Sequence, residues 1–296
     1  MNEPFVHIVP DATPVQRLSD YAVGVFAAIP TRKGIKKAIK KGWLQHNGQV
    51  GQTGNWVQTG DRLELQVPER SVKIFDYPIE VVYQDNDIAV VVKPAGLVVS
   101  GHQFRTLENA LPQHLEPSSR IDKLEHFRAA HRLDHATSGL LIVAKTRSAR
   151  TRLGEQFANR QVQKTYAAIV QGKPSSEEGI ITDPVDGKMA QTEYQVLQSV
   201  RSLKTGFLTF VALRPVTGRT HQLRRHMAGL GCPILGDKLY HGDRPLLRGK
   251  GLFLAATTLI FQHPVTQNAL HFIIEPPTKF TYRLAQEKRR WLAKKG

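Results

Sequence analysis

A short polar segment, residues 131–139, contains side chains that could carry out covalent chemistry. It reads His-Arg-Leu-Asp-His-Ala-Thr-Ser-Gly and places the carboxylate of Asp134 close to Arg132. A carboxylate is ionised at neutral pH and can serve as a nucleophile, and a nearby arginine can stabilise its charge. The same aspartate could instead cap a turn by accepting hydrogen bonds from the backbone amides of Ala136 or Thr137. The residues alone leave both roles open.

The elements on either side of this segment predict a rigid setting for Asp134. The branched apolar run at residues 140–144 is typical of a buried strand, and residues 137–139 have the composition of a turn that leads into it. A second strand is predicted at residues 164–170, where alternation places Tyr166 on one face with every second residue. On that pattern alone, Tyr166 is an ordinary aromatic residue of a strand.

Residues 218–230 predict a turn that enters a helix. His221 and Arg224 would then lie one helical turn apart. His221 and His226 are separated by about 140° around such a helix, so they cannot form the i, i+4 pair that a two-histidine metal site requires. We therefore expect no metal site on this helix.

Residues 131–139 resemble the HRLDxxTSG signature of the RluA-type pseudouridine synthases, and every fixed letter of that signature is present. Three other segments are similar to further motifs of the family and occur in the family's order along the chain. They are residues 93–97 (KPAGL), residues 164–172 (KTYAAIVQG) and residues 219–224 (RTHQLR). Several ordered motifs are far more specific than one short match. We therefore expect the chain to share the family's fold and activity.

The resemblance implies an α+β fold, in which the catalytic domain has a mainly antiparallel mixed central sheet flanked by helices. It also implies an isomerase that converts uridines of structured RNA to pseudouridine without a cofactor. Asp134 matches the family's nucleophile, and Arg224 matches the arginine that pairs with it. Tyr166 matches the tyrosine that packs against the target uracil and acts as general base or proton relay.

The resemblance also implies residues that contact RNA. Arg132 matches the family arginine associated with base flipping, and its planar guanidinium could fill the gap that the extruded base leaves. We expect His131 to orient the loop through hydrogen bonds and Arg219 to contact phosphate. Residues 236–242 resemble a family loop, GDxxYG, that is largely architectural, although the last glycine falls one residue late. Ala255 stands where the family usually has a histidine, which predicts a changed helper or packing contact.

The composition indicates a partner and a compartment. Lys and Arg total 41 against 25 Asp and Glu in 296 residues, a formal net charge of +16 that predicts salt-dependent attraction to RNA. This length favours two unequal units. The single cysteine, Cys232, excludes an intrachain disulfide and suits a reducing cytoplasm. No apolar run approaches a membrane span and the first residues do not read as a secretion signal, so we expect a soluble, cytoplasmic protein.

Residues 12–68 predict a small basic module, joined by a linker at residues 68–73 to a catalytic domain at residues 74–296. The module begins with an amphipathic helix from about residue 15, followed by a second helix and short strands with glycine-rich turns. Lysines recur along one side of the second helix at spacings of three and four. They are Lys33, Lys36, Lys37, Lys40 and Lys41. The pattern resembles the small RNA-binding module named after a small-subunit ribosomal protein, although a lysine stripe can also be a solvated helix face.

The partner implied by these features is RNA, with ribosomal RNA favoured and transfer RNA as the alternative, and we expect the protein to act as a monomer away from membranes. A rival from a different class is a catalytically silent RNA chaperone or ribosome-assembly factor that uses the same charged surface. Pure binding does not require Asp134 in a cationic cleft, which argues against this rival. A metal-dependent nuclease that uses the 12 histidines is disfavoured, because their spacing is scattered and clustered carboxylates are few.

Overall fold

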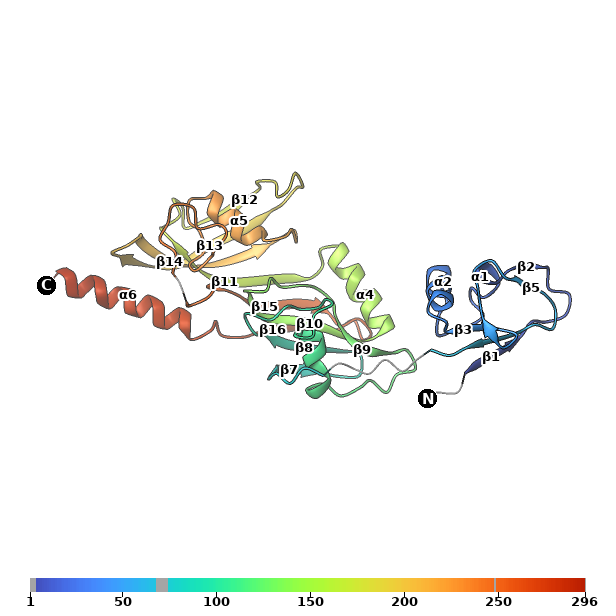
Figure 1. Cartoon of the computed structure of the whole chain (residues 1–296). Helices are drawn as coiled ribbons and strands as arrows, with labels where there is room; N and C mark the ends of the chain where they lie inside the picture. The colour runs from blue at the N-terminus through green and yellow to red at the C-terminus, as the bar shows by residue number, and fades with distance from the viewer. Residues whose placement is uncertain (1–3, 68–73, 248, 296) are drawn as a thin grey trace. The chain divides into compact units, whose positions relative to one another are not determined.

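The computed structural model describes residues 4–67, 74–247 and 249–295. The chain divides into two compact units, residues 1–71 and residues 72–296 (Figure 1). The predicted linker at residues 68–73 lies outside the described residues. Within the described ranges, no helix combines the length and apolar composition needed to cross a bilayer.

The smaller unit contains a four-stranded antiparallel sheet, two helices and a separate pair of short strands. Its elements are β1 (Phe5–Ile8), β2 (Gln16–Arg17), α1 (Leu18–Tyr21), α2 (Arg32–Lys40), β3 (Leu44–His46), β4 (Gln49–Val50), β5 (Trp56–Val57) and β6 (Arg62–Leu65). The sheet has the order β1-β6-β3-β4, and β2 pairs with β5. Along β6, Leu63 and Leu65 are buried and alternate with the less buried Arg62 and Glu64.

Helix α2 separates charge from core, as its lysine spacing predicts. Ile35, Ala38 and Ile39 are buried, and the five lysines named above are exposed. Thr31 caps the first turn, because its side-chain oxygen accepts a hydrogen bond of 3.2 Å from the Gly34 amide. The helix therefore presents a continuous basic face to solvent.

Two details of the smaller unit differ from the sequence prediction. Helix α1 is only one turn long, because the residues before it form β2, where Gln16 pairs with Val57. The unit also begins before residue 12, because β1 pairs with β6, with Phe5 opposite Leu65. In both places, backbone pairing with a distant strand decides the local structure.

The larger unit is built on one extensive sheet with helices at its faces and ends. Its elements are β7 (Glu80–Gln84), β8 (Ile88–Lys93), α3 (Leu107–Ala110), a 3₁₀ turn (Leu111–Gln113), β9 (Lys123–Ala129), β10 (Ser138–Thr146), α4 (Arg147–Ala158), β11 (Gln163–Gln171), β12 (Glu178–Ile181), β13 (Thr192–Ser202), β14 (Gly206–Pro215), α5 (Gln222–Gly229), β15 (Leu254–Gln262), β16 (Ala269–Ile273) and α6 (Lys279–Lys295).

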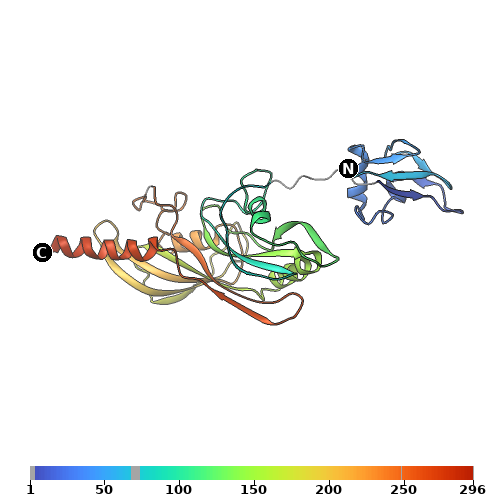
Figure 2. The same ribbon diagram turned by 90° about the horizontal axis from the view of Figure 1, so that it is seen from below.

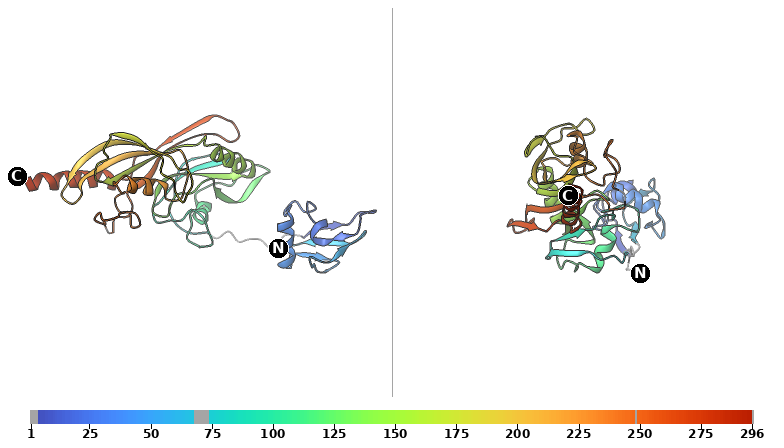
Figure 3. Two further views of the ribbon diagram at one scale, coloured as in Figure 1. Left: turned by 90° about the horizontal axis from the view of Figure 1, so that it is seen from above. Right: turned by 90° about the vertical axis from the view of Figure 1, so that its left-hand side faces the viewer.

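Strands of this unit follow the order β12-β13-β14-β11-β15-β10-β8-β7, and β16 and β9 pair with β15 and β10. Only β10 and β15 pair in parallel among the described strands of this sheet. Helix α4 packs on β9 and β10, α5 on β13 and β14, and α6 on β13, as two further views show (Figure 2, Figure 3). The predicted α+β class with a mainly antiparallel mixed sheet is confirmed.

The parallel pairing of β10 and β15 depends on a single glycine. Gly139 has a φ of +116°, and a Cβ at this position would lie 2.1 Å from the carbonyl oxygen of Ala256. Only glycine can therefore occupy the position without moving one strand. The last residue of the polar segment fixes how the chain enters the central strand, and so fixes where Asp134 stands.

Candidate active site

Asp134 lies in the loop between β9 and β10, and its carboxylate is half-buried at the wall of a cavity of about 110 Å³. The Thr137 amide donates to the main-chain carbonyl of Asp134, at 3.1 Å. Among the described residues, neither the Ala136 amide nor the Thr137 amide donates to the Asp134 carboxylate. The turn-cap interpretation therefore does not account for this side chain, which is left facing the cavity.

The cavity brings together side chains from four segments that are distant in sequence. Arg132, Asp134, Tyr166, Arg219 and Arg224 all line it. These are five of the residues that the sequence singled out. Their convergence in one concave site is the arrangement expected of an active site.

His131 does not line this cavity but holds its loop. Its Nε2 accepts a hydrogen bond of 3.2 Å from the Ile142 amide, and its ring packs 5.0 Å from the Phe157 ring. Burial, followed by the nearby charge of Lys164, lowers the pKa of His131 to about 3. The ring is therefore neutral and acts as an acceptor, and the orienting role of His131 stays a prediction.

Arg224 is fixed by a carboxylate that the sequence analysis did not assign to the site. Its Nε and Nη2 donate to the two carboxylate oxygens of Asp237 at 2.7 and 2.8 Å, whereas its Nη1 lies 3.4 Å from Oδ2 of Asp134. The side chain of Arg224 is 7 % exposed and that of Asp237 is 0 % exposed. Arg224 is thus held by Asp237 and presents its remaining nitrogen to Asp134. The sequence signal that could have identified Asp237 is its position after Gly236 in the GDxxYG-like loop, which we interpreted as architectural.

Tyr240 and His221 complete this network. The Arg224 guanidinium lies 5.1 Å from the centre of the Tyr240 ring, and the Tyr240 hydroxyl lies 2.9 Å from Nδ1 of His221. Nε2 of His221 lies 3.8 Å from Asp134. His221 also adopts a left-handed backbone conformation, with φ +55°, at the start of α5. A strained residue beside a candidate nucleophile is a frequent feature of functional sites.

Tyr166 reaches the cavity from β11, next to an irregularity in the pairing of β11 with β15 between Thr165 and Tyr166. Such bulges change the direction of a side chain and occur often beside active sites. Burial, followed by the charge of Asp134, raises the pKa of Tyr166 above its ordinary value. The phenol is therefore protonated at neutral pH, which favours a proton relay over a preformed base.

A buried lysine, Lys93, holds the loop that carries Asp134 in place. Lys93 is fully buried at the end of β8, and its Nζ donates to the carbonyl oxygens of Pro94, Leu97 and His135 at 2.8, 2.7 and 3.4 Å. The Gly96 amide also donates to the His135 carbonyl, at 2.7 Å. Lys93 therefore ties the 94–97 turn to the loop that carries the candidate nucleophile.

The burial of Lys93 predicts a pH-dependent contribution to stability. Desolvation lowers the pKa of this lysine from 10.5 to about 8, despite the opposing charge of Asp134. Between these values the unfolded chain keeps a proton that the folded chain releases, so the free energy of unfolding rises with pH. In urea unfolding, the free energy of unfolding of wild type should increase relative to that of Lys93→Met by up to about 3 kcal/mol between pH 7 and pH 10.5. The exposed control Lys188→Met should not differ in this way, and an equal gap for Lys93→Met at both pH values would contradict the expectation.

Ala255 lies on the side of β15 that faces away from the cavity. It is fully buried with Phe253 and Phe280, whereas Leu254 lines the cavity. The replacement of the family's usual histidine at this position therefore changes packing rather than the lining of the site.

One group of described residues has metal-compatible spacing. Ligand atoms of Asp85, Asp87 and His263 lie within 4.8 Å of one another. Asp85 already accepts hydrogen bonds from Tyr83 at 2.6 Å and is 2.8 Å from His263, and Asp87 pairs with Arg120 at 3.3 Å. These atoms form a hydrogen-bonded network outside the cavity. His221 and His226 point to separate partners, since His226 is buried against Thr192 and the Asp183 carbonyl.

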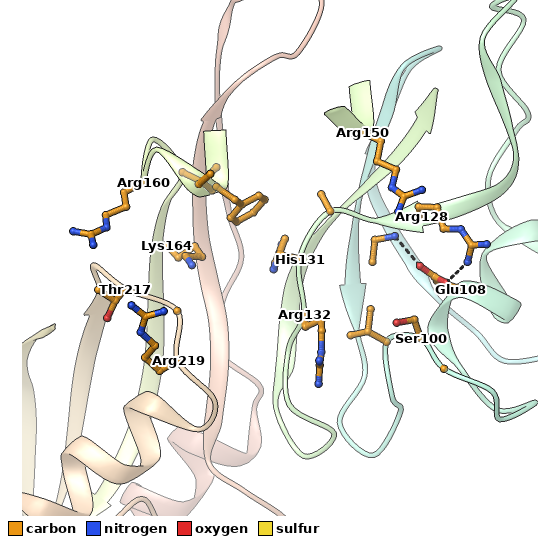
Figure 4. Close-up of a pocket in the computed structure, with 18 of the residues that line it drawn as sticks. Ser100, Glu108, Arg128, His131, Arg132, Arg150, Arg160, Lys164, Thr217 and Arg219 are labelled. Atoms are coloured by element: carbon orange, nitrogen blue, oxygen red, sulfur yellow. Dashed lines mark hydrogen bonds and ion pairs between the residues drawn. The ribbon is translucent and has the colours of Figure 1, made fainter. Parts of the chain in front are cut away.

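A much larger cavity, of about 1040 Å³, adjoins the small one. Both are lined by Arg132, Lys164 and Arg219. Figure 4 shows Arg160, Lys164 and Arg219 on one side of the larger cavity and Arg132 and Arg150 on the other. The small cavity that Asp134 faces therefore adjoins a basic cleft.

Residues 87–229 match the sequence model of a family described as RNA pseudouridylate synthase. An uncharacterized RNA pseudouridine synthase of Aquifex aeolicus is 36% identical over 278 residues, which cover 84% of this chain and 87% of that protein. The dual-specificity RNA pseudouridine synthase RluA of Shigella flexneri is 36% identical over 209 residues, 65% of this chain and 90% of that protein.

The solved structure of human RNA pseudouridylate synthase domain containing 4 aligns to this chain with a TM-score of 0.56 and 28% identity. The alignment covers 71% of this chain and 93% of the human chain. That of human RNA pseudouridylate synthase domain containing 1 has a TM-score of 0.52 at 24% identity, covering 74% and 98%. The second likeness, at its lower identity, concerns the fold alone.

Proposed function

The chain belongs to the RNA pseudouridylate synthase family, and we propose that Asp134 is the nucleophile with which it isomerises uridine in RNA. The protein is accordingly an RNA pseudouridine synthase, an isomerase. The observation that carries the proposal is the position of Asp134, whose carboxylate faces a small cavity together with Arg224 and Tyr166.

The isomerisation breaks one bond to the sugar and makes another at the same carbon. In the proposed sequence, a carboxylate oxygen of Asp134 forms a bond to carbon 1′ as the bond from that carbon to nitrogen 1 of uracil breaks. The freed uracil turns, carbon 5 forms a bond to carbon 1′, and the Asp134 carboxylate leaves. Carbon 5 then loses its proton and nitrogen 1 carries one, so that atoms and electrons balance without a redox partner.

The neighbouring groups supply charge and proton transfer. Arg224, held by Asp237, places a fixed positive charge beside the carboxylate of Asp134 in a partly desolvated site. The protonated phenol of Tyr166 can accept the proton of carbon 5 on its oxygen as its own proton passes to solvent, and solvent returns one proton to nitrogen 1. The small cavity limits the escape of the detached base. Asp134, Tyr166 and Arg224 line one cavity of a single chain, and we propose a monomer as the active form.

Arg132 fits the role of the residue that replaces the flipped base in its stack. It is exposed, lines both cavities, and makes no side-chain hydrogen bond or ion pair with another described residue. Its guanidinium is therefore free to stack in the gap that base flipping leaves.

We expect Arg132→Ala to slow turnover about tenfold on structured RNA and less than about threefold on an oligonucleotide whose uridine is already unstacked. The reason is that only in the first substrate must the target base be unstacked, at a cost in free energy. Single-turnover rates on the two substrates measure the difference. The control is Arg147→Ala, an exposed arginine that lines neither cavity. Equal losses on both substrates would contradict the flipping role.

The RNA that we propose as substrate is ribosomal RNA in the cytoplasm. Support comes from the smaller unit, whose exposed lysines on α2 and buried opposite face suit a basic RNA-binding module. Comparing pseudouridine maps of total RNA from cells with and without the gene tests this choice. We expect sites to disappear from ribosomal RNA, whereas losses confined to transfer RNA would assign the enzyme to that substrate instead.

A further inference from the structure

We propose that His221 is a positioning residue that holds one carboxylate oxygen of Asp134 and leaves the other oxygen to attack the sugar, a role that rests on the proposed synthase function. Nε2 of His221 lies 3.8 Å from Oδ2 of Asp134, and both side chains line the small cavity. Arg224 approaches the same oxygen, with its Nη1 at 3.4 Å. Within the part of the chain that the structure describes, Oδ1 of Asp134 makes no hydrogen bond. Oδ2 is therefore the held oxygen and Oδ1 the attacking one.

A chain of hydrogen bonds determines which nitrogen of the neutral His221 ring carries the proton. Arginine has no acceptor atom, so Nε of Arg225 donates to the hydroxyl oxygen of Tyr240, at 3.1 Å. The same hydroxyl lies 2.9 Å from Nδ1 of His221 and can donate its own proton there. Nδ1 then accepts, and the ring proton is on Nε2, the nitrogen beside Asp134. The chain from Arg225 therefore makes His221 a donor toward the carboxylate.

The surrounding contacts hold both ends of this chain. Nη1 of Arg225 pairs with Asp186 at 2.6 Å, so its guanidinium is fixed on the side away from Tyr240. The Tyr240 ring lies 5.1 Å from the guanidinium of Arg224 and 5.6 Å from that of Arg225. His221 itself has a φ of +55° and a ψ of +22°, a conformation that residues other than glycine seldom adopt. Such strain is retained where a contact needs it, and the contact here is with Asp134.

Donors on Oδ2 suit both halves of the proposed reaction. Their distances exceed the 2.7–2.9 Å or so of a typical charge-assisted hydrogen bond, so the free carboxylate keeps its charge for the attack. When Oδ1 binds carbon 1′, Oδ2 becomes the carbonyl oxygen of an ester. When that bond breaks, its electron pair returns to the carboxylate, and donors at Oδ2 stabilise the charge. Catalytic hydrogen bonds often shorten only in the substrate complex, so we expect His221 to affect kcat rather than KM.

The first test uses two substitutions that each replace a different nitrogen of the His221 ring with an amide. The amide of His221→Asn stands near the place of Nδ1, and that of His221→Gln stands near the place of Nε2. Asparagine also tolerates the left-handed conformation, so its effect is not one of backbone strain. We expect kcat to fall about 30-fold in His221→Asn and less than about fivefold in His221→Gln, with KM within about threefold of wild type. The control His271→Asn, at an exposed histidine of β16 that lines neither cavity, should keep its kcat.

The second test measures the ring proton without reference to activity. The ¹⁵N chemical shifts of imidazole distinguish a protonated from an unprotonated nitrogen, and the signals absent from His221→Asn identify His221. We expect a proton on Nε2 and none on Nδ1 in wild type at pH 8. Tyr240→Phe keeps the ring beside Arg224 but removes the hydroxyl, so it should shift the proton toward Nδ1 and lower kcat about fivefold. Tyr282→Phe, which removes a hydroxyl from a residue that is 63 % exposed, should change neither quantity.

Four results would overturn the inference. They are a folded His221→Asn with kcat within about twofold of wild type, equal losses of kcat in folded His221→Asn and His221→Gln, a proton on Nδ1 of wild-type His221, and a Tyr240→Phe variant with unchanged kcat and ring proton. The last result decides the matter where His221→Gln fails to fold. A proton on Nε2 together with full activity of Asp134→Asn would instead refute the proposed function, because the hydrogen-bond chain would stand and the nucleophile would not.

Discussion

Asp134→Asn is expected to abolish pseudouridine formation while leaving RNA affinity at or slightly above the wild-type level. Asparagine keeps the shape of the side chain, but its amide cannot form the bond to the sugar that the proposed mechanism requires. Loss of a covalent nucleophile lowers kcat by at least about 10³-fold. RNA binding loses no contact, and removal of a negative charge from a basic cleft slightly favours a polyanion. Mass-based mapping of pseudouridine in incubated RNA measures the first effect, and anisotropy measures the second.

A matched control uses another carboxylate that stands beside an arginine. Asp186 pairs with Arg225 at 2.6 Å and is 63 % exposed, so Asp186→Asn removes the same charge outside the cavity. This variant should form pseudouridine at the wild-type rate. If Asp134→Asn also keeps the wild-type rate, Asp134 is not the nucleophile. If wild type itself forms no pseudouridine but binds RNA, the silent RNA-binding factor becomes the better assignment.

The sequence predicted elements whose pattern depends on local burial. The strand after Asp134, the alternation around Tyr166 and the split between lysines and apolar residues on α2 all have periodicities that one segment contains by itself. The helix at the third motif was also predicted, because Leu223 and Met227 mark its buried face. Such patterns can be read without knowing which segments meet.

Features that depend on contacts between distant segments could not be predicted in this way. The charge of Arg224 was paired with Asp134 alone, whereas the structure gives its closest hydrogen bonds to Asp237, from a loop after α5. Lys93 was quoted only as part of a motif, although three carbonyl oxygens surround its ammonium. The basic cleft combines Arg150 and Arg160 with residues of other strands and loops. Spacing along the chain contains no information on these pairings.

Asp237→Asn is expected to reduce both stability and turnover, because it breaks the buried fork that holds Arg224. Burial alone would raise the pKa of Asp237, but hydrogen bonds from Arg224 and from the Leu239 and Tyr240 amides lower it, so this carboxylate is ionised at neutral pH. Asparagine can accept one of the two Arg224 hydrogen bonds, and its amide group then faces the second donor. Removing one charge of a buried pair costs about 3 kcal/mol of unfolding free energy.

The catalytic effect follows from the freedom that Arg224 gains. Its Nη1 now lies 3.4 Å from Asp134, and release from Asp237 lets the guanidinium move closer and form the stronger pair with Asp134. A tighter ion pair makes the Asp134 oxygen a poorer nucleophile. A guanidinium that has moved also no longer orients that oxygen, so kcat should fall about 10- to 100-fold. KM for RNA should change little, because Asp237 lines neither cavity.

Kinetics at a temperature where circular dichroism shows the variant folded separates this loss of kcat from unfolding. The exposed control Asp186→Asn should lose less than about 1 kcal/mol and keep its kcat. A folded Asp237→Asn protein with wild-type kcat would show that Arg224 does not need Asp237 to serve Asp134.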